Sequence, residues 1–175
     1  ETLTAQLAAP VGPMALLMPY EPVAESEPSL GERHAGWAQV REGDAGVIFC
    51  LGNTLETALT VRAIMYTEHQ QQYGIMCIGD LVPGQAWQRI GTHLCPHYVT
   101  IEEGAGGFGA LLRRVLDGPY TSWLHCDTCE LFVPAGSKEE CAVWAGLAPM
   151  QIVERIIRRW GVPIPREQRR RAEQP

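Results

Sequence analysis

The chain has 175 residues, 46% of them hydrophobic and 19% charged, which predicts a globular protein with one main domain. Its formal net charge of −6 excludes strong non-specific binding of nucleic acid by the molecule as a whole. The longest apolar runs, such as residues 47–51, are far too short to cross a bilayer, so we predict no transmembrane segment. The six cysteines do not require a disulfide framework in a chain this long and apolar, so we predict a reducing, cytoplasmic compartment.

Composition divides the chain into three parts. Residues 1–33 are rich in proline and glutamate and predict an extended arm. Residues 34–161 have the patterning of a globular α+β domain, and residues 162–175 predict a disordered, arginine-rich tail. The chain begins with Glu1 and not with methionine, and we therefore expect a cleavage product, a fragment or a trimmed chain.

The predicted elements of the domain alternate between apolar runs and helical periods. In chain order they are a strand over 47–51, a helix from Asn53 to about Gln72, strands over 75–78 and 98–101, and helices over 108–116 and 149–160. Asn53 followed by Glu56 is typical of a capping box, and Gly161 ends the last helix. This order predicts an α+β fold with a small, mainly antiparallel sheet and packed helices.

One candidate for chemistry is a cysteine–histidine pair. Cys129 lies beside an acid, Glu130, and ahead of an apolar run, and a nearby base would make its thiol a nucleophile. His69, His93 and His97 are the candidate bases. The alternative is that Cys129 begins a buried apolar segment and is inert.

A second candidate is a zinc site, whereas the first hypothesis requires no cofactor. Cys126 and Cys129 have the C-x-x-C spacing of a zinc knuckle, and Cys95 and His97 could complete a tetrahedral set. The alternative is a group of cysteines and histidines at loop ends that hold no metal.

The segment at 104–109 fits the pattern G-x-G-x-x-G, follows a predicted strand and opens a predicted helix. Glu102 and Glu103 directly precede it and would repel a pyrophosphate. We therefore predict a glycine-rich turn and not a dinucleotide site.

Several short motifs resemble the H-box/NC family. They are Gly43-Asp44, the run at 73–80, Tyr120 and the box at 128–133. This family includes lecithin:retinol acyltransferase-like enzymes and the 2A proteins of kobuviruses and parechoviruses, which are picornaviruses. The resemblance implies a circularly permuted, NlpC/papain-like fold with Cys129 at the nucleophile position. Gln72 stands where the family has its histidine, and Gln cannot act as a general base. The resemblance therefore implies that acyltransferase or hydrolase activity is degenerate or lost.

The expected function is that of a viral non-structural protein for host interaction and replication support, in the host-cell cytoplasm. Its expected partners are host proteins, with RNA as a further partner of the tail's four arginines. The alternative is a zinc-stabilised interaction module. One protein of this class would be a herpesvirus tegument-like protein, because motifs at residues 49–52 and 133–144 faintly resemble that family.

Overall fold

The computed structural model describes residues 33–34, 36–79, 90, 95–104, 106–118, 121–128 and 135–161. The predicted tail at 162–175 and residues 1–32 of the predicted arm at 1–33 lie outside the described residues, whereas Arg33 belongs to a strand.

The described strands form one mixed sheet in the order β1-β2-β4-β3-β5-β6. Their bounds are β1 (Arg33–His34), β2 (Trp37–Arg41), β3 (Gly46–Leu51), β4 (Tyr73–Ile78), β5 (His97–Ile101) and β6 (Ser122–Cys126). Strand β3 pairs in parallel with β4 and β5, and β5 pairs in parallel with β6, whereas β2 runs antiparallel to β1 and β4. The predicted small α+β fold of one sheet with packed helices is thus confirmed. The prediction that the sheet is mainly antiparallel is wrong, because helical crossovers connect neighbouring strands and leave them parallel.

The described helices are η1 (Gly52–Thr54), α2 (Leu55–His69), α4 (Gly107–Leu116), α5 (Lys138–Ala145) and α6 (Pro149–Trp160). Helices α2, α4 and α6 are close to their predicted positions. Helix α6 has its predicted bounds, with Pro149 in its first turn. Helix α2 ends earlier than predicted, because Gln70 adopts a left-handed conformation with φ of 55°. No separate residue range was predicted for strands β1, β2 and β6, for η1 or for helix α5.

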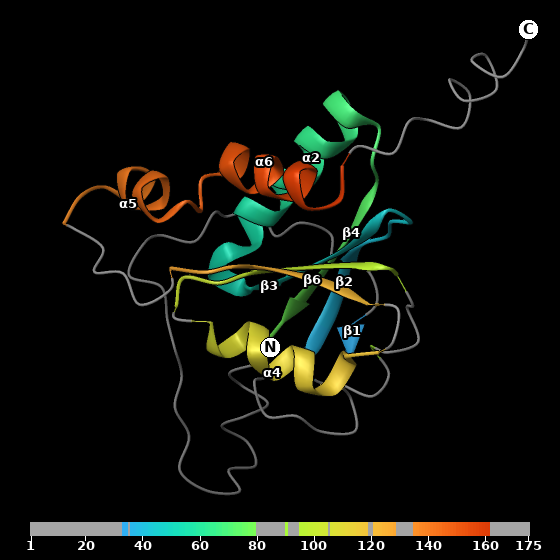
Figure 1. The fold of residues 1–175 in the computed structure, drawn as a ribbon. Helices are drawn as coiled ribbons and strands as arrows, with labels where there is room; N and C mark the ends of the chain where they lie inside the picture. Colours follow the sequence, from blue (N-terminus) through green and yellow to red (C-terminus); the bar gives the residue numbers. More distant parts are fainter. Residues whose placement is uncertain are drawn as a thin grey trace, which may run out of the picture.

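Helices cover both faces of the sheet (Figure 1). Helices α2 and α6 pack on one face, where their buried side chains meet Ile48 and Cys50 of β3. Helix α4 packs on the other face, where Phe108 and Leu112 meet the intervening β3 residues Val47 and Phe49. Strand β3 is therefore buried on both faces and contributes side chains to both core clusters. Among the described residues, no helix combines the length and the apolar character needed to cross a membrane.

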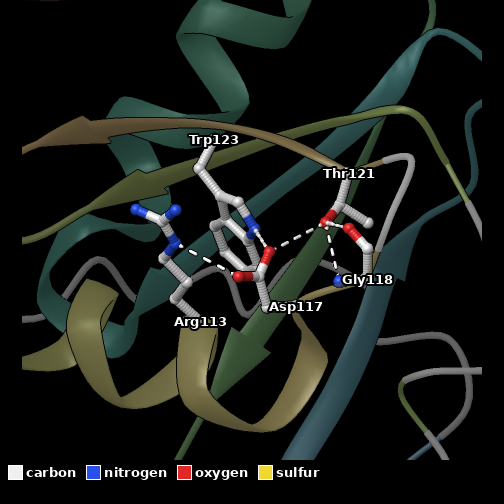
Figure 2. A network of polar contacts seen from close by, with 5 residues as sticks. All are labelled: Arg113, Asp117, Gly118, Thr121 and Trp123. Carbon is white, nitrogen blue, oxygen red and sulfur yellow. Dashed lines mark hydrogen bonds and ion pairs between the residues drawn. The ribbon is translucent and has the colours of Figure 1, made fainter.

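The turn from α4 to β6 is held by the side chain of Asp117 (Figure 2). Its Oδ1 accepts hydrogen bonds from the Thr121 hydroxyl at 3.1 Å and from Nε1 of Trp123 at 3.2 Å, and Arg113 lies 3.5 Å from Oδ2. The backbone N–H of Gly118 in turn donates to Thr121 Oγ1 at 3.0 Å. These contacts lower the pKa of Asp117, chiefly through Thr121, and fix the point at which β6 enters the sheet.

Candidate functional site: the carboxyl edge of the parallel strands

The parallel strands β3, β5 and β6 end at one edge of the sheet, which we call the carboxyl edge. It comprises the ends of these strands and the described residues that follow them, 52–54, 102–104, 106 and 127–128. After β3 the chain enters α2 on one face, and after β5 it enters α4 on the other. The two connections therefore diverge between β3 and β5. In open sheets with parallel strands, ligands bind at such a topological switch point.

The loop after β3 is tied to the end of β5. Thr54 is buried, and its hydroxyl lies 3.0 Å from the carbonyl oxygen of Ile101 and accepts the backbone N–H of Leu51 at 3.1 Å. Nearby, Nδ2 of Asn53 donates to Oε2 of Glu103 at 2.8 Å, and both of these side chains are exposed. Asn53 and Glu103 therefore span the switch point and present an amide and a carboxylate to solvent.

The loop after β5 is organised by Glu102, whose side chain is only 5% exposed. Its two carboxylate oxygens accept the backbone N–H groups of Phe108 at 3.0 Å and Gly109 at 2.9 Å, in the first turn of α4. These donors lack partners within the helix, and the carboxylate also complements the positive end of the helix dipole. The helix N-terminus is thus occupied by the protein's own carboxylate. Gly106, with φ of 82°, supplies the left-handed residue before the helix.

Helix α4 approaches the sheet closely at Gly109. A Cβ atom on Gly109 would collide with the ring of His125 and lie 2.9 Å from Oγ1 of Thr100. The same Thr100 oxygen lies 2.9 Å from Nδ1 of His125, and the imidazole stacks on Trp123. Burial lowers the pKa of His125, as does Arg113, against the opposing effects of Asp127 and Glu102. His125 is therefore a neutral imidazole at neutral pH, held directly beneath α4.

The chain after β6 is tied to the loop after β5. The backbone N–H of Thr128 donates to the carbonyl oxygen of Gly104 at 3.0 Å, and the Thr128 hydroxyl donates to the same oxygen at 2.9 Å. The three loops of the carboxyl edge are consequently connected to one another by hydrogen bonds.

Two of the predicted catalytic residues, Cys129 and His93, lie outside the described residues. The candidate base His69 is the last residue of α2 and lies where β4 is about to begin, at the amino ends of the parallel strands. The last described residue before Cys129 is Thr128, which lies at the carboxyl edge. The third candidate base, His97, is the first residue of β5 and also lies at the amino edge, where its ring stacks on Trp160.

Two of the four predicted zinc ligands, His97 and Cys126, lie too far apart to bind the same ion, and Cys129 lies outside the described residues. His97 pairs with Ser122 at the start of β6, whereas Cys126 pairs with Ile101 at the end of the same ladder. Four residues along a strand separate the two ends by about 13 Å, but zinc lies only about 2.0–2.3 Å from each of its ligands. Cys95 precedes β5 and lies at the same end as His97. Within the part of the chain that the structure describes, no group of three or more His, Cys, Asp or Glu side chains is placed to hold a metal.

Sequence reasoning singled out Glu102 only as a residue that would repel pyrophosphate, and it did not identify the acid as the partner of the helix N-terminus. The signal was an acid at the end of a strand, directly before a glycine-rich helix start. The packing of His125 against Gly109 had no such signal, because the two residues lie on different elements.

No model of a known protein family matches the chain, and no curated protein matches its sequence. The resemblance to the H-box/NC family therefore stays a prediction, and the similar structures give it no support.

Transketolases are similar to the chain in structure. A split-gene transketolase, described as an inactive β4 tetramer, matches with a TM-score of 0.62 and 18% identity over 80% of this chain and 46% of its own. A Pichia stipitis transketolase in complex with sedoheptulose 7-phosphate matches with a TM-score of 0.54 and 13% identity, over 70% of this chain and 18% of its own. Campylobacter jejuni transketolase matches with a TM-score of 0.56 and 11% identity, over 76% of this chain and 20% of its own. The chain thus shares the fold of one part of these proteins and spans less than half of their length.

Proposed function

We propose that this chain is a domain of a transketolase-like enzyme and acts as part of a larger assembly. The observation that carries the proposal is the match of 80% of the chain to 46% of the split-gene transketolase subunit. Most of the chain thus corresponds to less than half of a protein that is itself described as an inactive β4 tetramer. We infer that the chain alone does not turn over substrate.

The carboxyl edge is the surface that would face the substrate or the rest of the enzyme. It lies at the topological switch point, where ligands of related folds bind. Its exposed groups are the Asn53 amide and the Glu103 carboxylate, which suit the hydroxyl groups of a sugar. The carboxylates of Glu102, Glu103 and Asp127 disfavour a phosphate at this edge. A sugar phosphate, such as the one bound by the Pichia transketolase, would therefore place its phosphate on another part of the enzyme.

The test compares the isolated chain with the natural protein that contains it. An antibody raised against residues 33–161 isolates the natural species, and turnover of sedoheptulose 7-phosphate is measured for both. We expect turnover by the natural species and none by the isolated chain. Turnover by the isolated chain would contradict the need for an assembly. If the natural species has the 19.3 kDa mass of this chain and shows no turnover, the proposal that the chain belongs to a transketolase-like enzyme is contradicted.

A further inference from the structure

Two cysteines lie opposite each other at the centre of the sheet. Cys50 of β3 and Cys77 of β4 are partners in the parallel register, and both side chains contact the core beneath α2 and α6. Neighbouring strands lie about 4.8 Å apart, and disulfide-bonded residues have Cα atoms about 4.4–6.8 Å apart. The backbone therefore holds the two residues at a separation that a disulfide can bridge.

The two thiols are in contact and differ in environment. The Cys50 thiol donates to the carbonyl oxygen of Met76 at 3.8 Å, and the Cys50 and Cys77 side chains also interact through a hydrogen bond. This contact lowers the pKa of Cys77, against the opposing effect of burial. The same contact, together with burial, raises the pKa of Cys50. Cys50 is fully buried, whereas Cys77 is partly exposed.

We propose that Cys50 and Cys77 form an oxidisable dithiol, in which Cys77 reacts with a hydroperoxide and Cys50 then closes a disulfide. In the first step the Cys77 thiolate attacks the peroxide, so that an S–O bond forms, the O–O bond breaks and hydroxide leaves. In the second step the Cys50 sulfur attacks the Cys77 sulfenic acid. An S–S bond forms, the S–O bond breaks, and the Cys50 proton leaves with the hydroxyl group as water. The two thiols lose two electrons and the peroxide gains them.

The alternative is that both thiols only fill space in the core. The asymmetry of the pair argues against this, because a reactive cysteine is accessible and acidified and has a resolving thiol beside it. Cys126 does not share this arrangement, since it lies on β6, with β5 between it and β3, and burial raises its pKa to about 11.

The position of the pair suggests what oxidation would affect. Cys50 and Cys77 are the next-to-last residues of β3 and β4, so a disulfide would form just beneath the carboxyl edge. It would join the strand that leads into residues 52–54 to its neighbour. This inference does not rest on the proposed function, because it concerns only thiol chemistry.

The pairing is tested by mapping cysteines in the intact chain. The reduced protein is treated with hydrogen peroxide, quenched with N-ethylmaleimide, digested with trypsin and examined by mass spectrometry. Cys50 and Cys77 fall on separate tryptic peptides, 42–62 and 63–89, because Arg62 lies between them. We expect these two peptides to be linked, with the loss of two hydrogens. The link should be absent in Cys77→Ala and retained in the control Cys141→Ala, whose cysteine lies on α5.

A second measurement tests the order of events. Under native conditions N-ethylmaleimide should modify Cys77 before Cys50. Cys50→Ala removes the hydrogen bond to Cys77, so the pH midpoint of Cys77 alkylation should rise. Peroxide that oxidises Cys77 without any linked peptide, or that links only other cysteines, would overturn the proposal. The map of the unmutated protein decides this even if Cys50→Ala does not fold.

Discussion

The backbone N–H of Gly109 lies 2.9 Å from a carboxylate oxygen of Glu102, so the first turn of α4 is closed by the residue that follows β5. The other oxygen of the same carboxylate accepts the N–H of Phe108. One buried side chain therefore joins the strand to the helix that covers it. The free energy of this contact can be measured.

We predict that Glu102→Ala lowers the free energy of unfolding by about 1–3 kcal/mol, because two buried N–H donors lose a charged acceptor. The free energy of unfolding of Glu102→Gln should lie between those of Glu102→Ala and the parent, since glutamine retains one acceptor oxygen. The matched control is Glu103→Ala at the exposed neighbouring position, which should change stability by less than about 0.5 kcal/mol. Urea unfolding followed by circular dichroism measures all three. Equal effects at the two positions would mean that Glu102 does not hold the helix.

Two glycines of α4 should respond in opposite directions to the same substitution. Gly109→Ala places a methyl group against His125 and Thr100, and overpacking of this kind costs about 1–3 kcal/mol. Gly107 has open space where its Cβ would lie, so Gly107→Ala should stabilise the helix by up to about 0.5–1 kcal/mol. Thermal unfolding compares the two variants. If His125→Ala does not relieve part of the cost of Gly109→Ala, the collision with the ring is not its cause.

Much of the fold could be predicted from local pattern. The apolar runs of β3 and β4 and the period of α6 gave those elements directly, because each buries a continuous or regular set of side chains. The sequence also contains a pattern that indicates parallel pairing, and the prediction of an antiparallel sheet did not use it. Strand β3 is apolar at consecutive positions, as is typical of a strand with helices on both faces.

The site was less predictable, because it depends on which ends of the strands meet. The zinc hypothesis joined Cys95 and His97 to Cys126 through their spacing in sequence. His97 begins β5 and Cys126 ends β6, and only the parallel register shows that these positions are far apart. Strand β6 was missed because its five residues mix polar and apolar side chains, with only Trp123 and Cys126 buried.

Stability should fall as the pH drops below neutrality, because two histidines are held neutral. Burial lowers the folded pKa of both His125 and His97 from the ordinary value of 6.5. On acidification the unfolded chain therefore takes up protons before the folded protein does. The stability that the two neutral histidines contribute is fully present above the ordinary pKa of 6.5 and is lost as the pH falls through their lower folded pKa values. Thermal melts should show that the unfolding midpoint of the parent declines as the pH falls below neutrality. This decline should be shallower in His125→Gln. A decline of the same steepness in the variant would exclude His125 as a source.

The turn at Asp117 should show the acid dependence of a carboxylate. Thr121 and Trp123 donate to this side chain, and its folded pKa lies below the ordinary value of 3.8. A lowered folded pKa stabilises the protein above the unfolded pKa, and this contribution is lost as the pH falls through the folded pKa. We predict that Asp117→Ala lowers the unfolding midpoint at neutral pH and that the difference from the parent narrows in acid. Asp44→Ala, at another exposed aspartate, is the control and should change the midpoint little. Melting curves of the three proteins at neutral and acid pH measure this, and a difference that stays constant with pH would show that the charge of Asp117 plays no part.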